Sequence, residues 1–247
     1  MTDSVLSFGG GVNSVALAIL LVNEGWRGHV VFSDTGTEWP DTYCYMEMFE
    51  REWLKPRELE IVRLGVEFRG STRTKALIEH CEERRVIPVQ HPRWCTRDYK
   101  VRPMQRWCKA HGLSNDQSIL GIAADESWRM PLARRPLVDR GIDRDGCVRI
   151  IKGAGLSVPH KSGCYICPFQ RNDQWRELWT RYPELFERAA RLERMPRNKT
   201  EGWVGRGYVL AADGHTTLAQ RRLAYESQMQ LFDDEELMEY RPCLCSL

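Results

Sequence analysis

The chain has no long apolar run, no marked excess of one charge and no basic start, and each absence excludes a class of protein. The longest apolar run, residues 15–22, is far shorter than the ~20 residues that a membrane-spanning helix needs. Lys and Arg number 36 and Asp and Glu 34, so the net charge of +2 by itself predicts no partner. The start, Met-Thr-Asp-Ser, is unlike a signal peptide. We therefore expect a soluble, cytoplasmic protein without a membrane partner.

Cysteine, in contrast, is abundant. The 247 residues include nine cysteines, an odd number. Disulfides are rare in reducing compartments, so a metal, a cluster or thiol chemistry is the better interpretation of any clustered subset. Cys164 and Cys167 have C-x-x-C spacing, which suits a metal or a cluster, with a thioredoxin-like redox pair as the alternative. Four isolated cysteines are expected to pack in apolar surroundings: Cys44, Cys81, Cys108 and Cys147.

Strand and helix patterns alternate along the first half of the chain. Strands are expected at 4–8, 29–33, 60–64 and 119–123, and helices at 13–24, 41–55 and 74–84. This order predicts βαβ units, and hence an α/β fold with a parallel twisted sheet flanked by helices. The pattern becomes helical over 173–195 and 216–239. We expect one domain at 1–170 and a helical, arginine-rich C-terminal extension at 171–247.

Three consecutive glycines follow the first predicted strand, in S-F-G-G-G-V-N-S (7–14). Successive backbone N–H groups in such a turn form an anion nest, and the following helix adds its positive end. Ser7 and Ser14 can donate further hydrogen bonds. No lysine follows the glycines as in a Walker loop, and position 14 is not the Gly or Ala of a dinucleotide fingerprint. The loop predicts a phosphate site, and a tight turn is the alternative.

A second loop, S-D-T-G-T-E-W-P-D-T-Y (33–43), follows the second predicted strand. Asp34 could bind Mg²⁺ or a ribose hydroxyl, or it could cap the next turn. Thr35 and Gly36 permit a close approach of the backbone to a ligand. Ligands of open α/β sheets bind beyond the carboxyl ends of the strands. We therefore expect the loops 7–14, 34–42 and 121–129 to meet at one edge of the sheet.

Arginines flank the C-x-x-C on both sides, interleaved with Trp175, Trp179 and Trp203. Basic side chains beside aromatic platforms fit contact with a nucleic acid. Glutamates stand among them at helical spacing, so a salt-bridged helix face is the alternative. The arginines in question are Arg134, Arg135, Arg140, Arg144, Arg149, Arg171, Arg176, Arg181, Arg188, Arg191, Arg194 and Arg197.

Taken in order, these motifs resemble the PP-loop ATP pyrophosphatases and their phosphoadenosine-phosphosulfate (PAPS) reductase branch. The loop 7–14 is similar to S-G-G-x-D-S, and the loop 33–43 to D-T-G-x-x-x-P-E-T. W-C-T-R-D-Y-K-V-R-P (94–103) resembles the C-C-x-x-R-K-x-x-P segment of cluster-bearing adenylylsulfate reductases. G-I-A-A-D-E-S-W-R (121–129) resembles G-x-R-x-x-E-S-x-x-R, and P-L-V-D (136–139) resembles P-L-x-D/E.

The resemblance implies an adenine nucleotide alpha-hydrolase-like, Rossmann-like fold that binds the phosphates of ATP, with Mg²⁺, or of a sulfonucleotide. Asp34 would serve the ribose or Mg²⁺, and the candidate clamps for anionic oxygens are Arg97, Lys100, Arg102 and Arg129. The residues placed at the nucleotide are Ser7, Gly9, Gly10, Gly11, Asn13, Ser14, Asp34, Thr35, Gly36 and Gly121. Many family loops carry Lys-Asp where this chain has Val12-Asn13, which removes one phosphate contact and one charged metal ligand.

The same resemblance implies a [4Fe–4S] cluster on Cys95, Cys164 and Cys167, with zinc as the other occupant. Trp94 stands where the reductases have one cysteine of a pair. Three ligands would leave one iron open for a sulfide or persulfide. The fourth ligand could instead be Cys243 or Cys245, and these two could equally form a mobile persulfide carrier.

The leading hypothesis is an iron–sulfur ATP pyrophosphatase that adenylates a nucleic-acid oxygen for sulfur insertion, releasing pyrophosphate and then AMP. The acceptor would be the DNA backbone, as in the phosphorothioation enzymes of this branch, or a tRNA base. A cysteine desulfurase or another sulfur donor is the expected protein partner, and a homodimer is left open. One alternative is a sulfonucleotide reductase that releases sulfite, although the tail R-P-C-L-C-S-L lacks the E-C-G-[LI]-H context. The other is a non-catalytic nucleotide-binding subunit.

Overall fold

The computed structural model of the chain describes residues 4–65, 75–114, 117–129, 133–195, 209–210 and 213–229. The chain divides into two compact units. Unit 1 comprises residues 1–74 and 96–163, and unit 2 comprises residues 75–95 and 164–247. The predicted boundary after residue 170 stays a prediction. Arg197, Trp203, Cys243 and Cys245 lie outside the described residues.

Unit 1 is built on a four-stranded parallel sheet. Its strands are β1 (Val5–Ser7), β2 (His29–Ser33), β3 (Ile61–Leu64) and β4 (Ser118–Leu120), in the order β3-β2-β1-β4. All three pairings are parallel, with β1 at the centre between β2 and β4. The four predicted strands and the predicted α/β fold are thereby confirmed.

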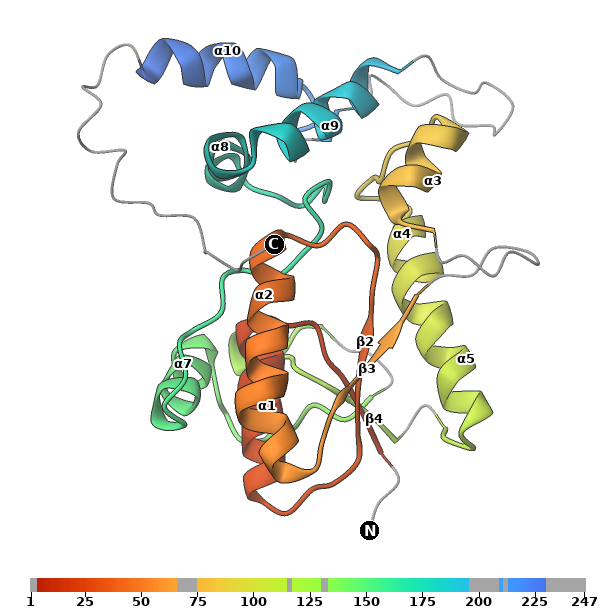
Figure 1. The fold of residues 1–247 in the computed structure, drawn as a ribbon, viewed down its shortest axis with the longest axis vertical. Helices are drawn as coiled ribbons and strands as arrows, with labels where there is room; N and C mark the ends of the chain where they lie inside the picture. The colour runs from red at the N-terminus through yellow and green to blue at the C-terminus, as the bar shows by residue number, and fades with distance from the viewer. Residues whose placement is uncertain are drawn as a thin grey trace. The chain divides into compact units, whose positions relative to one another are not determined.

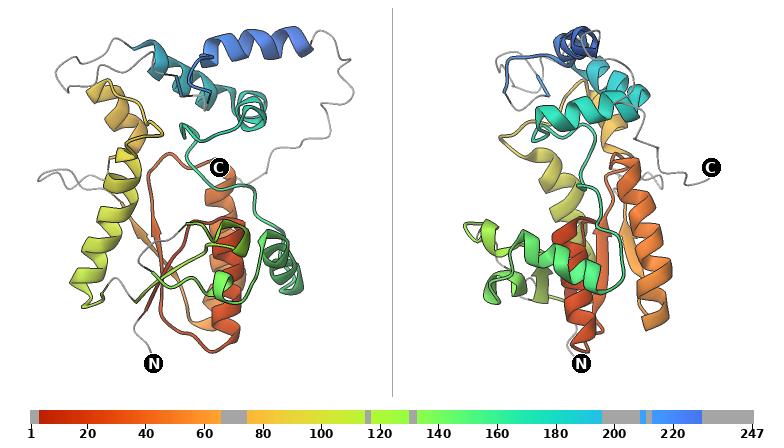
Figure 2. Two further views of the ribbon diagram at one scale, coloured as in Figure 1. Left: turned by 180° about the vertical axis from the view of Figure 1, so that it is seen from behind. Right: turned by 90° about the vertical axis from the view of Figure 1, so that its left-hand side faces the viewer.

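Helices cover both faces of this sheet (Figures 1 and 2). One face carries α1 (Val12–Asn23), α2 (Pro40–Phe49) and, packed against α1, α7 (Arg144–Gly153). The other face carries α5 (Arg102–Ala110). Helix α2 continues into the π-helical segment η1 (Glu50–Leu54) and the short 3₁₀ turn η2 (Lys55–Arg57). The described residues of unit 1 also form three shorter pieces: the π-helical segment η3 (Arg97–Val101), which leads into α5, the 3₁₀ turn η5 (Ala124–Glu126), and α6 (Pro136–Asp139).

Strand side chains alternate between two apolar layers, as a period of two requires. Leu6, Val30 and Phe32 pack in the layer of α1, α2 and α7. Val5 and Val31 pack in the layer of α5. These strand residues are at most 2% exposed, and full burial of each such side chain contributes about 1.5–3 kcal/mol. Because both faces are covered, the central strands β1 and β2 are mostly apolar, and the carboxyl ends of the strands are left as the accessible edge.

The described residues of unit 2 form helices: α3 (Leu77–Arg84), the one-turn helix α4 (Trp94–Thr96, shared with unit 1 at its end), α8 (Asn172–Arg181), α9 (Pro183–Arg194) and α10 (Leu218–Met229). Pro183 separates α8 from α9 because it cannot continue the hydrogen bonding of the preceding helix. The carboxylate of Glu193 accepts the backbone N–H of Leu210 and that of Leu218, each at 2.7 Å, which ties α9 to the start of α10. The predicted helical C-terminal region is confirmed. Within the described ranges, no helix is long and apolar enough to cross a membrane.

Candidate functional site

The glycine loop joins β1 to α1 at the carboxyl edge of the sheet. Gly10 has a φ of +67°, in the left-handed region that favours glycine. A Cβ at Gly10 would lie 3.0 Å from Met46 Cγ and 3.1 Å from Thr42 Cγ2, so α2 leaves no room for a side chain. Helix α1 has no acidic residue in its first turn, and its positive end is therefore not neutralised from within the helix. This end of the loop can bind an anion.

Ser14 organises the loop from the first turn of α1. Its hydroxyl donates to the Gly11 carbonyl at 2.9 Å and accepts from the Gly9 N–H at 3.3 Å. Gly121, at the end of β4, packs directly on this turn, because a Cβ there would lie 2.9 Å from both the Cα and the backbone N of Ser14. The loops after β1 and β4 thus meet, as the sequence predicted.

Asn13 is the second link between these two loops. Its Nδ2 donates to Glu126 Oε2 at 3.3 Å, and its Oδ1 accepts from Arg144 at 3.0 Å. The Arg129 guanidinium lies 3.3 Å from Glu126 Oε2. The structure therefore brings Asn13 and Arg129 together through the Glu126 carboxylate, which the Arg129 guanidinium contacts. Arg144 joins this group from α7, whereas the sequence had placed it only among the arginines that flank the C-x-x-C.

The loop after β2 is organised by its own side chains. Asp34 Oδ1 accepts the Gly36 N–H at 2.8 Å and the Tyr43 hydroxyl at 2.7 Å. Burial and the hydrogen bond to Asp34 hold the pKa of Tyr43 well above its usual range, so this hydroxyl keeps its proton as the donor. Asp34 caps the turn, which was its alternative interpretation. Its role toward Mg²⁺ or a ribose stays a prediction.

Lys100 is positioned at the same edge by a buried carboxylate. Its Nζ lies 3.2 Å from Glu38 Oε1, whose side chain is only 2% exposed, whereas that of Lys100 is 43% exposed. Glu38 Oε1 also accepts from the Thr35 hydroxyl at 3.1 Å. The Ser33 hydroxyl, at the end of β2, donates to the Lys100 carbonyl at 3.1 Å. Sequence reasoning missed Glu38, although it stands inside the quoted loop.

Arg97 and Arg102 both pair with the carboxylate of Asp98. Arg97 makes two hydrogen bonds of 2.8 Å to Asp98, and Arg102 lies 2.6 Å from the same carboxylate. Both arginine side chains are 59% exposed. The hydrogen bond to Asp98 raises the pKa of Arg97. One half-buried carboxylate thus holds both guanidinium groups, and their role as phosphate clamps stays a prediction.

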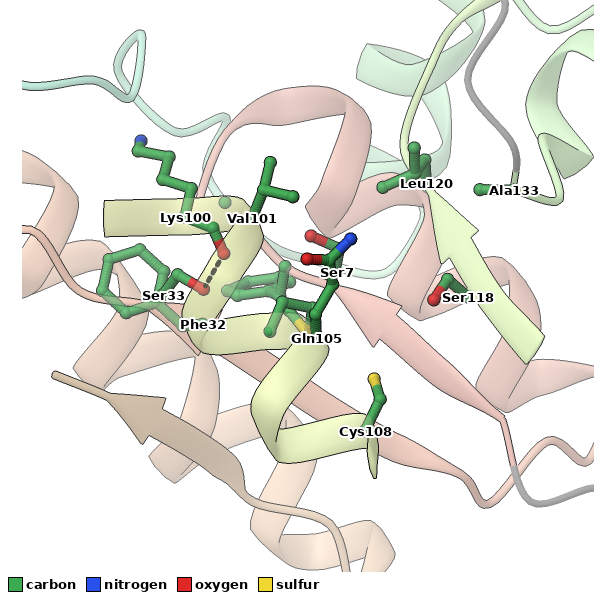
Figure 3. Close-up of a pocket in the computed structure, with 13 residues that line it drawn as sticks. Ser7, Phe32, Ser33, Lys100, Val101, Gln105, Cys108, Ser118, Leu120 and Ala133 are labelled. Carbon is green, nitrogen blue, oxygen red and sulfur yellow. Dashed lines mark hydrogen bonds between the residues drawn. The ribbon is translucent and has the colours of Figure 1, made fainter. Parts of the chain in front are cut away.

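A cavity of about 360 Å³ lies beside Lys100, between the strand ends and α5 (Figure 3). This volume is within the range of about 300–1,000 Å³ for small-molecule sites. Serine hydroxyls and an amide stand among apolar walls, which suits a flat ring carrying polar groups at its rim. The cavity is lined by Ser7, Phe8, Gly9, Phe32, Ser33, Lys100, Val101, Met104, Gln105, Cys108, Ser118, Leu120 and Ala133.

The three candidate cluster ligands, Cys95, Cys164 and Cys167, all lie in unit 2. The Cys167 N–H donates to the Cys164 carbonyl at 3.0 Å, which closes a turn over the C-x-x-C. None of the seven cysteines in the described ranges forms a disulfide. In those same ranges, no three His, Cys, Asp or Glu stand as a group that could hold a metal ion. The soft thiol donors suit a cluster or zinc by their chemistry, and the cluster stays a prediction.

The isolated cysteines follow their expected packing only in part. Cys81, Cys108 and Cys147 are buried, and burial raises the pKa of each thiol. Cys44 is half-buried.

Many arginines of unit 2 form ion pairs. Trp175 is fully buried and cannot serve as a stacking platform, so the interpretation of that residue was wrong. Several arginines pair with carboxylates of the same unit: Arg171 with Asp173, Arg181 with Glu177, Arg188 with Glu82, Arg194 with Glu187, Arg221 with Asp213 and Arg222 with Glu187. Contact with a nucleic acid stays a prediction.

Known proteins resemble the chain in sequence. The family model of the phosphoadenosine phosphosulfate reductase domain matches residues 3–135, which are 133 of the 247 residues. The uncharacterized protein MJ0066 of Methanocaldococcus jannaschii is 24% identical over 226 residues, which cover 82% of this chain and 44% of that protein. The uncharacterized nin region protein ORF290 of Escherichia phage lambda is 29% identical over 146 residues, 51% of this chain and 50% of that protein. The chain spans about half the length of the relatives that it matches.

Among solved structures, the PAPS reductase from Candida auris in its phosphate complex aligns with a TM-score of 0.46. The sequence identity is 15%, and the alignment covers 64% of this chain and 76% of that chain.

Proposed function

The chain belongs to the family of phosphoadenosine phosphosulfate reductase domains, and on that premise we propose that it is an ATP pyrophosphatase that activates a nucleic-acid oxygen for replacement by sulfur. The observation that carries this proposal is the combination, within unit 1, of a glycine loop at a helix start and a cavity of about 360 Å³. Gly9 contributes to both, because it belongs to the glycine loop and also lines the cavity. An adenosine group in the cavity would place its phosphates toward the loop.

The first step is attack of an acceptor oxygen on the α-phosphorus of ATP. The new bond joins that oxygen to phosphorus, the bond from the α-phosphorus to the bridging oxygen breaks, and pyrophosphate leaves with the bonding electrons. Backbone N–H groups at Gly10 and Gly11 and the start of α1 would stabilise the leaving pyrophosphate. Lys100 and Arg129 would neutralise charge on the phosphoryl oxygens, and Asp34 would hold a Mg²⁺ ion, which supplies further positive charge when bound.

The second step exchanges oxygen for sulfur. A sulfide-level donor attacks the activated acceptor atom, the bond from that atom to the adenylated oxygen breaks, and AMP leaves with this oxygen. A cysteine desulfurase with a thiol reductant would supply sulfur at that oxidation level. The residues of unit 1 contribute by holding AMP as the leaving group, which is positioning rather than covalent catalysis.

Cys95, Cys164 and Cys167 of unit 2 would hold a [4Fe–4S] cluster, with zinc as the other occupant. Such a centre, when bound, fixes the segments that carry its ligands, and an iron without a protein ligand can also bind sulfur. DNA is our preferred acceptor and a tRNA base the second, on the resemblance of the loops 7–14 and 33–43 to the reductase-like branch.

A sulfonucleotide reductase is the second candidate, and the matched family model supports it. In that reaction a cysteine thiolate attacks the sulfur of adenylylsulfate or PAPS, the bond from sulfur to the phosphate oxygen breaks, and the nucleotide leaves. A dithiol reductant then releases sulfite from the cysteine. Cys243 or Cys245 would have to act as the nucleophile.

The test is turnover of anaerobically purified full-length chain with ATP, alone and with DNA or tRNA. We expect pyrophosphate release that depends on the nucleic acid and is lost in Lys100→Met, while Gly153→Ala on α7 retains it. Sulfite from adenylylsulfate or PAPS, with no pyrophosphate from ATP, would establish the reductase instead. Tight ATP binding without either product would overturn both and leave a nucleotide-binding subunit.

A further inference from the structure

Trp128 is the most exposed large apolar side chain in the described part of the chain, at 77%. It follows the short turn η5 in the loop after β4, at the carboxyl edge of the sheet. Burial of so large a ring is strongly favourable, and an indole left in water is typical of a surface that a ligand or partner covers. The sequence analysis had considered only the tryptophans that lie beyond the C-x-x-C.

The backbone on both sides of Trp128 is fixed by hydrogen bonds. Arg135 Nη1 donates to the carbonyl of Ser127 at 3.2 Å and to that of Arg129 at 2.9 Å. The Arg129 N–H donates to the Glu126 carbonyl at 3.0 Å, which closes the turn that carries Trp128. One guanidinium thus holds the carbonyls immediately before and after the tryptophan. A backbone fixed in this way loses little conformational entropy when a ligand covers the ring.

The turn with Trp128 is joined to the glycine loop through Glu126. The Glu126 carboxylate accepts from Asn13 Nδ2 at 3.3 Å, and Asn13 lies in the first turn of α1. Consecutive Cα atoms are about 3.8 Å apart, so the Cα of Trp128 lies within about 7.6 Å of that of Glu126. Trp128 therefore lies near the loop to which the proposed function assigns the phosphates of ATP.

The charges around Trp128 favour an anionic partner. Arg135 and Arg144 donate to neutral oxygens, namely backbone carbonyls and the Asn13 side-chain amide, so these contacts leave both positive charges in place. The segment 125–135 carries three arginines against two carboxylates, and the Glu126 carboxylate is already paired with Arg129. An exposed aromatic ring with guanidinium groups around it matches the surfaces that bind single-stranded nucleic acids.

We propose that Trp128 is the platform on which an unpaired base of the acceptor nucleic acid stacks, with Arg135 and Arg144 contacting its phosphates. This assignment rests on the proposed function, because it concerns the same acceptor. Stacking on an aromatic ring tolerates any base, since every base has a π face, and guanidinium groups bind phosphate oxygens through several N–H donors. A base seated on Trp128 keeps the neighbouring phosphate of the strand near the glycine loop.

A base inside a duplex can stack on Trp128 only after it leaves its own stack. The free-energy cost of unstacking is smallest for a single strand or a mismatched position. We therefore expect single-stranded DNA to bind more tightly than the fully paired duplex of the same sequence, with a singly mismatched duplex between them. A purely electrostatic surface would give the opposite order, because the duplex has the higher charge density.

The experiment titrates full-length variants into fluorescein-labelled single-stranded DNA and follows fluorescence anisotropy. Trp128→Ala should raise the Kd about 5- to 150-fold, the loss expected for one base–aromatic stack. Trp128→Phe keeps a ring and should bind nearly as well as wild type. Leu223→Ala is the control for loss of an exposed apolar side chain, because Leu223 is 61% exposed on α10 of unit 2, and its Kd should not change. The slope of log Kd against log salt concentration should be the same in Trp128→Ala and wild type, because stacking releases no counterions.

Four results would overturn the proposal. They are equal binding of single-stranded DNA by wild type and Trp128→Ala, tighter binding of the duplex, no binding of DNA or tRNA by wild type, and an equal rise in the Kd for ATP in Trp128→Ala. The last result would place the ring at the nucleotide instead. Pyrophosphate release is assayed separately, so stacking without turnover would remove the ATP pyrophosphatase and keep the platform. Turnover with DNA binding unaltered in Trp128→Ala would remove the platform and keep the enzyme.

Discussion

Gly121→Ala tests whether the loops after β1 and β4 form one site. The added Cβ would stand 2.9 Å from the Cα and the backbone N of Ser14. Ordinary contact between such atoms is about 3.5–4.0 Å, so the two loops would have to separate by roughly 0.6–1.1 Å. The opposing atoms are backbone and cannot move aside as a flexible side chain can. Overpacking of this kind costs about 1–3 kcal/mol.

For a chain of this size, each kcal/mol lowers Tm by about 2–4 °C. We therefore expect Tm to fall by roughly 2–12 °C in differential scanning calorimetry. The displaced turn carries the start of α1, so the Kd for ATP should also rise. The rise is about tenfold for each 1.4 kcal/mol of binding free energy that is needed to return the turn to its position. Isothermal titration calorimetry of the same samples measures that Kd.

Gly153→Ala is the matched control. Gly153 ends α7, and a Cβ there meets no heavy atom within 4 Å. The substitution should leave the Kd for ATP unchanged and raise stability by about 0.4–1 kcal/mol, because alanine has less freedom in the unfolded chain. If Gly121→Ala matches wild type in both Tm and Kd, the close packing of the two loops is refuted.

Three more predictions concern the same two units. Gly10→Ala should weaken ATP binding and lower the free energy of unfolding by about 1–2 kcal/mol, because residue 10 has a left-handed backbone and its new Cβ would contact α2. Calorimetry with and without ATP measures both effects. Lys100→Met should raise the Kd for ATP about tenfold through loss of a cation at the cavity, measured by titration at fixed ionic strength. In unit 2, the hydrogen bond from Arg188 lowers the pKa of Glu82. That pair therefore stabilises the fold above the ordinary glutamate pKa of about 4.3 and loses its effect as the pH falls through the lowered value. Arg188→Gln should thus lower the free energy of unfolding at pH 7 by about 0.5 kcal/mol, because both side chains are partly exposed. The free energy of unfolding should also fall less between pH 7 and pH 3 in the variant than in wild type, as measured by urea titration.

Each of these three substitutions has a result that would contradict its prediction. Unaltered ATP binding in Gly10→Ala would mean that the loop is a turn and nothing more. An unchanged Kd in Lys100→Met, with the fold intact, would place the phosphates elsewhere. Parallel stability curves for wild type and Arg188→Gln across the acid range would show that Glu82 titrates without help from Arg188.

Much of unit 1 could be predicted because its signals are local. Alternation of short apolar strands with helices predicted the parallel sheet, and the glycine run predicted the turn at the start of α1. The meeting of the loops after β1 and β4 followed from the rule that carboxyl ends of parallel strands share one edge. These features depend on patterns of a few neighbouring residues, and such patterns can be read without knowing the tertiary structure.

The remaining features depend on long-range partners. Arg144 reaches Asn13 across 131 positions, and nothing in the local sequence marks it as a partner of Asn13. Buried Glu38 holds Lys100 across 62 positions. A short motif shows which chemistry is present, whereas the pairing of side chains is decided by how the elements pack.

The π-helical segment η3 carries Lys100 into the edge of the cavity, and its geometry bears on how such sites change during evolution. A π turn holds one residue more than an α turn, and π segments occur often at functional sites. Deleting Val101 would restore the regular helical period and rotate everything before it by about 100° relative to α5. The ammonium group would then leave Glu38 and aim elsewhere, although no other side chain had been replaced. An insertion or deletion of one residue here can therefore redirect a cation, so that descendants of one ancestral domain could acquire different anionic substrates through chain length alone.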